Sequence, residues 1–181
     1  VLVTAQHREM LDQVLDFFDI TPDYDLNVMK AGQTIEYITE ETLRGVSEVL
    51  RQEKPDAILV HGDTTTTFAA CLAATYLKIP VGHIEAGMRT GDITQPFPEE
   101  LNRTLVARMA RWNFVPSREC EQNLLNEGIA PEKIFRTSHN TGVSALLLAQ
   151  KELGIELNEK NDSHQILVTA HRRESWGAGM R

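Results

Sequence analysis

Three clusters of histidine, acidic and basic side chains each follow a short apolar run of the sequence. These clusters are His61-Gly62-Asp63-Thr64, the segment HIEAGMR at 83–89, and His171-Arg172-Arg173-Glu174. If each apolar run is a strand of a parallel sheet, each cluster lies just past a carboxyl end, where open α/β sheets bind ligands. Glu99 and Glu100, which follow a proline-rich loop, would reach the same edge. The sequence therefore predicts one cleft surrounded by carboxylates, histidines and arginines.

Such a cleft suits proton transfer on an anionic substrate. Carboxylates held close together raise one another's pKa, so one can act as an acid while another acts as a base near neutral pH. A well-placed acid or base contributes roughly 10²- to 10⁴-fold to a rate. Arginine side chains and helix N-termini bind phosphate oxygens, and they would give the cleft a local positive charge.

Each of these residues also fits a purely structural role. Asp63, which precedes four threonines, fits a helix N-cap. Glu99 and Glu100 fit the first turn of a helix, where acidic side chains complement the macrodipole. The others fit core histidines bonded to the backbone, or a solvated arginine pair: His61, His83, Arg172 and Arg173. The position of every cluster at a strand end favours a shared site over these alternatives.

Short apolar runs alternate with longer segments of helical period, which predicts βαβ units. Strands are expected at 1–4, 25–29, 57–60, 79–84, 112–115, 133–136 and 165–169. Helices are expected at 7–18, 33–53, 64–73, 99–110, 117–126 and 143–152. This alternation is typical of the α/β class, with a Rossmann-like, mainly parallel sheet and flanking helices.

Apolar stripes on the first two expected helices predict which sides face the core. The stripes are Met10, Val14, Phe17 and Phe18 on the first helix, and Ile35, Ile38, Leu43 and Val46 on the second. Their members recur at three- to four-residue intervals, as on one face of an α-helix. We therefore expect both stripes to be buried.

The length and composition allow one complete domain and part of another. Of the 181 residues 41% are hydrophobic, which is enough for one sizeable core. The polar segment 158–164 is typical of a linker, so we expect a first domain at 1–157 and an incomplete second Rossmann-like domain at 165–181. The chain begins inside an apolar run, Val1-Leu2-Val3, without an initiator methionine, which we interpret as a missing first strand.

Charge and cysteine usage argue against several classes of partner. A formal net charge of -8 disfavours nucleic acid and anionic membranes, which bind broad basic surfaces. No apolar run approaches the roughly 18 residues of a membrane span, and no signal peptide precedes the first strand. Cys71 and Cys120 belong to no CxxC pair, so neither a disulfide framework nor a zinc knuckle is expected, and a reducing cytoplasm fits best.

Motifs for metals and cofactors are incomplete in the sequence. His83-Ile84-Glu85 has the H-x-E form of zinc deaminases, but the P-C-x-x-C that should follow is absent. Neither G-x-G-x-x-G nor G-x-x-x-x-G-K-[ST] occurs, so dinucleotide and P-loop sites lack support. We therefore expect neither a bound metal nor a cofactor.

Five strings in order give the chain a recognisable pattern over nearly its whole length. TAQHREMLDQVL, VHGDTTTT, VGHIEAGMRT, PFPEELNR and ILVTAHRRESWG resemble the non-hydrolysing UDP-N-acetylglucosamine 2-epimerases. The resemblance implies two Rossmann-like domains, arranged as in B-type glycosyltransferases, that enclose a nucleotide sugar. It also implies a cytoplasmic homodimer that interconverts UDP-N-acetylglucosamine and UDP-N-acetylmannosamine for bacterial surface polysaccharides, by elimination and re-addition of UDP.

The resemblance also implies roles for individual residues. The catalytic residues it implies are Asp63, Glu85, Glu99 and His171, with Asp63, Glu85, Arg103, His171 and Arg172 binding the substrate. A second, regulatory site between the domains would include Gln6, His7, Gln33 and Arg172.

The chain also departs from the family pattern. No G-T-R-P-E turn precedes Val1, most of the second domain is absent, and the T-G-N-T hinge is shifted, with Ser144 where an Asp is usual. We therefore expect these residues to be inactive alone. A hydrolysing relative that releases N-acetylmannosamine and UDP, and a non-catalytic remnant, are the alternatives.

Overall fold

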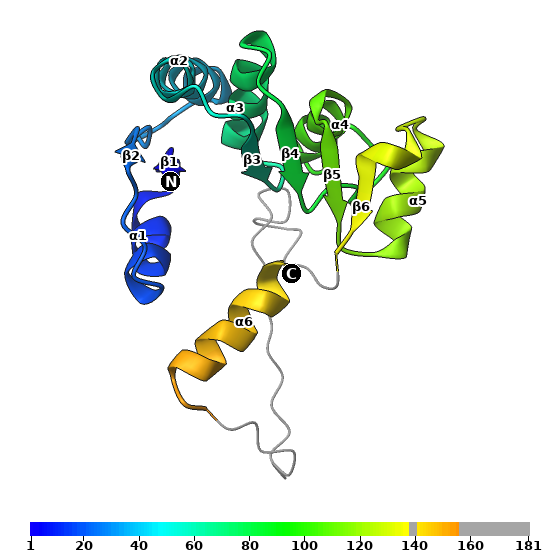
Figure 1. The fold of residues 1–181 in the computed structure, drawn as a ribbon. Coiled ribbons are helices and arrows are strands. Elements are labelled where there is room, and N and C mark those ends of the chain that lie inside the picture. The colour runs from blue at the N-terminus through cyan, green and yellow to red at the C-terminus, as the bar shows by residue number, and fades with distance from the viewer. Residues whose placement is uncertain (138–140, 156–181) are drawn as a thin grey trace, which may run out of the picture. The chain divides into compact units, whose positions relative to one another are not determined.

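The computed structural model describes residues 1–137 and 141–155 of the chain (Figure 1). The chain divides into two compact units, Val1–Asn140 and Thr141–Arg181. The described residues of the second unit include the helix α6 (Thr141–Glu152). The linker expected at 158–164 and the strand expected at 165–169 lie outside the described residues, so the predicted domain boundaries remain predictions.

Two parallel sheets form the first unit, one of four strands and one of two. The larger sheet has the order β3-β4-β5-β6, with β3 (Ile58–His61), β4 (Val81–Ile84), β5 (Trp112–Val115) and β6 (Ile134–Arg136). The smaller sheet pairs β1 (Leu2–Val3) with β2 (Tyr24–Asp25). Because the pairs in the larger sheet are all parallel, its carboxyl ends lie along one edge. The arrangement confirms the expected α/β class.

Helices connect the strands of the first unit, as the alternation predicted. They are α1 (Arg8–Phe17), α2 (Ile35–Glu53), α3 (Thr65–Tyr76), α4 (Glu99–Met109) and α5 (Arg118–Asn126), with a 3₁₀ turn at Pro131–Lys133. Caps set three of the starts, because Thr34, Thr64 and Ser117 each accept a hydrogen bond from the N–H three residues later. Within the described ranges, no helix combines the length and hydropathy that crossing a bilayer requires.

The strand predicted at 25–29 is shorter and earlier than expected, since β2 covers Tyr24–Asp25. Asn27 has a φ of 45°, in the left-handed region, which ends the extended conformation. Its N–H bonds to Oδ1 of Asp25 at 2.9 Å. A local turn closed by an Asp side chain therefore stops the strand.

One of two clusters of buried hydrophobic residues lies between the helices and the four-stranded sheet. Its buried members come from α2, α3, α4, β3 and β4: Val46, Leu50, Val60, Cys71, Ala73, Ala74, Val81 and Val106. The helix α3 packs against both α2 and α4, and it contributes the smallest side chains of this set. Small side chains let these helices approach closely, and Cys71 is completely buried among them.

The apolar stripe of α1 is not buried, contrary to the prediction. Met10 is 72%, Val14 52% and Phe17 43% exposed, and α1 contains no buried residue. Of the described elements, none packs closely against α1. The stripe predicts which side of the helix is apolar, whereas burial also requires an apolar surface opposite it. On α2 the prediction fails at the first residue, Ile35, which is 38% exposed.

Gly87 lies where the loop after β4 meets the first turn of α5. Its φ is 87°, and a Cβ at this position would lie 2.4 Å from the carbonyl oxygen of Cys120. Gly91 has a similar φ of 82°, but a Cβ there would have no heavy atom within 4 Å. The close approach at Gly87 therefore requires glycine for steric reasons as well as for its backbone conformation.

We expect Gly87→Ala to lower the free energy of unfolding by about 2 kcal/mol more than Gly91→Ala. Both variants force alanine into the left-handed region, but only the first adds a clash with the backbone of Cys120. Urea unfolding of both variants beside the wild-type protein measures the difference. Equal losses would show that the approach to α5 relaxes without cost.

Candidate functional site

The ends of β3 and β4 bring the first two predicted clusters together. His61 is the last residue of β3, and Glu85 directly follows β4. His61 Nε2 lies 3.3 Å from Glu85 Oε2, and the two side chains are 54% and 20% exposed. His61 therefore contacts a carboxylate at an open edge of the sheet, and the core-histidine alternative is wrong for this residue.

Glu85 has a left-handed backbone conformation, with a φ of 64°. This conformation costs a residue other than glycine roughly 1–2 kcal/mol, so the surrounding structure must hold it. Ile84 accepts a hydrogen bond from Gly62 N–H, and Ala86 N–H donates to Phe114, both at 3.0 Å. Bonds on either side of Glu85 thus fix the turn. Backbone strain of this kind clusters at functional sites.

Asp63 is held by two side chains of α4. Its Oδ2 lies 3.0 Å from Arg103 Nη2, and its carbonyl oxygen accepts a hydrogen bond from Asn102 Nδ2 at 2.9 Å. The N-cap of α3 is Thr64, whose hydroxyl accepts from the N–H of Thr67. The N-cap alternative for Asp63 is therefore wrong, and its partly exposed carboxylate lies on the same edge as Glu85.

Arg103 and Glu100 form a buried ion pair beneath this edge. They are 8% and 3% exposed, and Arg103 Nε lies 3.4 Å from Glu100 Oε2. The other oxygen of Glu100 accepts hydrogen bonds from the N–H groups of Thr90 and Gly91, at 3.1 and 3.2 Å. Glu100 therefore anchors the loop after β4. Glu99, half-buried at the start of α4, accepts from Arg103 Nε through its carbonyl oxygen.

His83 is completely buried and holds the turn before Asp63. Its Nε2 lies 2.8 Å from the carbonyl oxygen of Gly62. A carbonyl oxygen only accepts, so Nε2 carries the proton and donates it. Burial, the largest cause, lowers the pKa of His83 to about 4, so the imidazole is neutral near pH 7. The core-histidine alternative is confirmed for His83.

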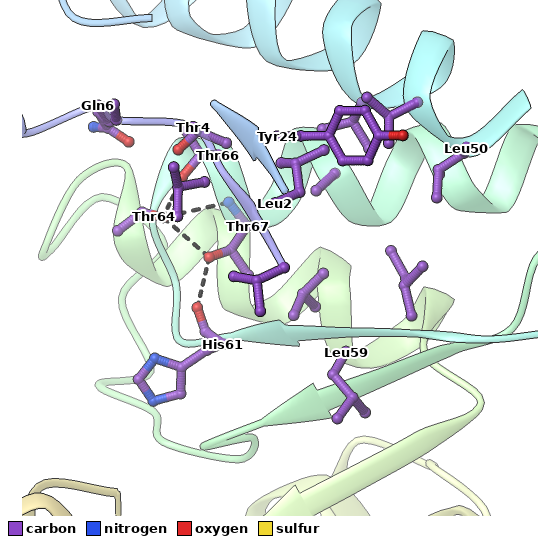
Figure 2. A pocket seen from close by; sticks show the side chains of 18 of the residues that line it. Leu2, Thr4, Gln6, Tyr24, Leu50, Leu59, His61, Thr64, Thr66 and Thr67 are labelled. Carbon is purple, nitrogen blue, oxygen red and sulfur yellow. Dashed lines mark hydrogen bonds between the residues drawn. The ribbon is translucent and has the colours of Figure 1, made fainter. Parts of the chain in front are cut away.

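Sequence reasoning missed two supporting side chains at this edge. Asn102 links α4 to the backbone of Asp63, and the hydroxyl of Thr67 donates to the carbonyl oxygen of His61 at 2.6 Å (Figure 2). The sequence signal for Asn102 was its spacing from Glu99, since it follows that residue by three positions. Residues three or four apart lie on the same face of a helix, so Asn102 could have been expected on the face that carries Glu99. Thr67 is the last of four consecutive threonines. Its hydrogen bond to His61 forms only once α3 is folded against the end of β3, so the sequence alone gives no signal for it.

Arg89 was expected among the arginines of the cleft, and the structure gives it another partner. Its Nε and Nη2 lie 2.6 and 3.0 Å from the two carboxylate oxygens of Glu127. The Arg89 side chain is 8% exposed. This bidentate pair fastens the loop after β4 to the end of α5, so Arg89 has a structural role.

The residues expected at the regulatory site are described in part. Gln33 Nε2 donates to the carbonyl oxygen of Gln6 at 3.1 Å, which brings these two residues together. His7 is exposed at the N-cap position of α1. His171 and Arg172 lie outside the described residues, so the regulatory site and the role of His171 remain predictions.

The edge thus presents two partly exposed carboxylates, Asp63 and Glu85, on neighbouring strand ends. Carboxylates held on separate elements can exchange protons with different parts of one ligand. Within 1–137 and 141–155, no group of three or more His, Cys, Asp or Glu side chains could hold a metal ion.

Known proteins are similar to this chain in sequence and fold. A family model described as UDP-N-acetylglucosamine 2-epimerase matches residues 1–181. The chain is 53% identical over 190 residues to the UDP-N-acetylglucosamine 2-epimerase of Salmonella typhimurium and 52% identical to that of Escherichia coli K12. Each match covers 99% of this chain and 50% of the relative. The chain therefore spans about half the length of these relatives.

Solved structures give the same family resemblance. A crystal structure of UDP-GlcNAc 2-epimerase from Neisseria meningitidis bound to UDP-GlcNAc matches with a TM-score of 0.79 and 52% identity, over 86% of this chain and 42% of that one. A putative UDP-N-acetylglucosamine 2-epimerase from Listeria monocytogenes matches with a TM-score of 0.87 and 48% identity, over 99% of this chain and 48% of that one.

We expect Arg103→Ala to lower the free energy of unfolding by about 3–5 kcal/mol, because it leaves the charge of Glu100 buried without its cation. Arg44→Ala is the matched control, since the ion pairs of Arg44 with Glu41 and Glu48 are exposed, and we expect a much smaller loss. Urea unfolding measures both. Adding Glu100→Gln to Arg103→Ala should restore part of the loss; an unchanged loss would refute the buried-charge explanation.

Acid should destabilise the protein through His83. The pKa of His83 is about 4 in the folded protein, whereas an unperturbed histidine, as in the unfolded chain, has a pKa of 6.5. The unfolded chain therefore takes up the proton first as the pH falls. The stabilisation is complete above about pH 6.5 and is lost toward pH 4, on the order of 3 kcal/mol in all. His83→Gln retains a donor for Gly62 without titrating. Its free energy of unfolding should therefore vary less between pH 7 and 4, and an identical slope would exclude a contribution from His83.

Proposed function

The chain belongs to the UDP-N-acetylglucosamine 2-epimerase family, and we propose on that basis that it forms the first nucleotide-sugar-binding domain of a non-hydrolysing isomerase. The proposed enzyme interconverts UDP-N-acetylglucosamine and UDP-N-acetylmannosamine. The observation that carries the proposal is the pair of partly exposed carboxylates, Asp63 and Glu85, on neighbouring strand ends. The relative from Neisseria meningitidis binds UDP-GlcNAc, which supports a nucleotide sugar as the ligand.

The proposed reaction inverts C2 of the sugar by elimination and re-addition of UDP. The C2 hydrogen is not adjacent to a carbonyl group, so its removal is coupled to cleavage of the bond between C1 and the UDP oxygen. Loss of the proton and of UDP forms a double bond between C1 and C2. Return of UDP to C1, and of a proton to the opposite face of C2, gives the epimer. One proton and one UDP leave and return, so the reaction is balanced.

The proposed roles follow from where the side chains are held. Asp63 and Glu85 provide two carboxylates that can remove and return the C2 proton, and Glu99 at the start of α4 is the third candidate. His61 contacts Glu85, whereas Arg103 and His83 position the segment that carries Asp63. Cys71 and Cys120 are buried free thiols, which supports a reducing, cytoplasmic environment for the protein.

Carboxylate-to-amide substitutions test these roles. We propose a chimera that completes residues 1–181 with the remaining sequence of the 53% identical Salmonella typhimurium relative. In this protein Asp63→Asn and Glu85→Gln should each lower epimer formation about 10²- to 10⁴-fold, because each removes a proton-transferring group. Chromatography of UDP-N-acetylglucosamine, UDP-N-acetylmannosamine, UDP and free sugar measures the rate and the products.

Glu48→Gln is the control, because Glu48 lies on the exposed face of α2 and should leave the rate unchanged. Normal rates in both site variants would contradict the assigned roles. Release of free N-acetylmannosamine with UDP would replace the proposal with a hydrolysing enzyme, and an inactive chimera would favour a non-catalytic remnant.

A further inference from the structure

One face of α5 holds the loop that follows β4. Cys120, Asn123 and Glu127 lie on this face, because residues three and four apart share one side of a helix. Each of the three contacts the loop. The helix itself packs against β5 and β6, whereas the candidate carboxylates follow β3 and β4 (Figure 1). The loop therefore connects α5 to the end of a different strand, where the candidate site lies.

The inner part of the loop is held through its backbone. Gly87 lies so close to the first turn of α5 that a Cβ on it would be 2.4 Å from the carbonyl oxygen of Cys120. The carbonyl oxygen of Gly87 accepts a hydrogen bond from Asn123 Nδ2 at 3.0 Å. Between Glu85 and Gly87, Ala86 is completely buried. The contacts with α5 therefore begin directly beside the left-handed turn at Glu85.

The outer part of the loop is held by the bidentate ion pair of Arg89 with Glu127. The two side chains are 8% and 24% exposed. Nε and Nη2 of Arg89 bind the carboxylate, and Nη1 donates to the carbonyl oxygen of Met88 at 2.8 Å. All three guanidinium nitrogens are thus engaged. A pair of this geometry fixes orientation as well as distance.

Polar contacts, more than apolar packing, hold this outer part. Arg89, Gly91 and Ile93 border a hollow of about 380 Å³ whose other side is formed by α4 and α5. Ile93 is 53% exposed. Across the hollow, the loop is bound through Arg89 to Glu127 and through two backbone N–H groups to Glu100. Loss of the ion pair should therefore loosen the loop, because little packing remains to replace it.

We propose that Asn123 and Glu127 are positioning residues for Glu85 in the proposed epimerisation. Asn123 fixes the backbone two residues after Glu85, and Glu127 fixes the following segment through Arg89. Both act through the loop and need no contact with the substrate. Misplacement of a reacting group by about 1 Å can cost on the order of 10²-fold in rate. The inference rests on the role proposed for Glu85, whereas the mechanical link between α5 and the turn does not.

Amide hydrogen exchange in the 181-residue chain tests the link without any reaction. The reporter is Ala86, whose N–H directly follows the turn and bonds to β5. Glu127→Gln keeps the size of the side chain but removes the charge that binds Arg89, so exchange at Ala86 should become about tenfold faster. Exchange at Gly62, whose N–H bonds to the end of β4, should not change.

Two further variants separate the link from general effects on α5. Glu121→Gln is the matched control, because Glu121 lies on the same helix and pairs with Arg136 of β6. It should leave exchange at Ala86 unchanged. Asn123→Leu removes the donor to Gly87 at similar side-chain size, and it should also speed that exchange about tenfold.

A double-mutant cycle tests whether Glu127 acts through Arg89. If it does, the variant that combines Arg89→Gln with Glu127→Gln should exchange at Ala86 no faster than Arg89→Gln alone. The second change then removes nothing that the first leaves in place. Additive effects would give Glu127 a separate contribution and would overturn its role through Arg89.

The chimera with the Salmonella typhimurium sequence gives the catalytic readout. Glu127→Gln and Asn123→Leu should each lower kcat for epimer formation at least about tenfold, because a misplaced Glu85 transfers protons less well. KM should change less than about twofold, since neither side chain binds the substrate. Glu121→Gln should retain the kcat of the parent chimera.

Three results would overturn the proposal. The first is unchanged exchange at Ala86 in both Glu127→Gln and Asn123→Leu. The second is faster exchange with an unchanged kcat, and the third is an equal loss of kcat in Glu121→Gln. An inactive parent chimera would reject the reaction and with it the positioning role, whereas an active parent that is insensitive to both variants would reject the positioning role alone.

Discussion

The buried guanidinium of Arg103 is the interaction on which the arrangement of this edge depends. From one position on α4 it contacts Asp63, which follows β3, and Glu100 in its own helix. Glu100 in turn binds the N–H groups of Thr90 and Gly91 in the loop after β4. Because Arg103 and Glu100 are almost fully buried, water cannot replace either partner. One cation therefore couples two strand ends to one helix.

His83 provides a second constraint that carries no charge near neutral pH. A neutral imidazole can donate to the carbonyl oxygen of Gly62 inside the core without the desolvation that a cation would suffer. Arg103 holds the carboxylate of Asp63, and His83 holds the carbonyl oxygen of Gly62, the residue directly before it. Two buried side chains thus hold the backbone and the side chain at Asp63, while its carboxylate stays partly exposed to solvent.

The strands and the edge that carries the site could be predicted because both depend on neighbours in the sequence. A short apolar run and the polar residue directly after it are adjacent, and parallel pairing then places Asp63 and Glu85 together. Which side chain each charged residue pairs with could not be predicted, because the partners come from segments far apart in the sequence. Arg89 pairs with Glu127, 38 residues later, instead of lining the cleft. The stripe of α1 is a similar case, because periodicity does not show whether an apolar surface lies opposite.

At Glu85, the left-handed backbone lowers the stability of the fold, but the side chain there places a carboxylate at the open edge. A glycine at this position would relieve about 1–2 kcal/mol of strain, an appreciable part of the roughly 5–15 kcal/mol that keeps a typical domain folded. It would also remove the side chain that meets His61 at the open edge. Stability and the placement of an acidic group at the open edge therefore make opposite demands on this one residue.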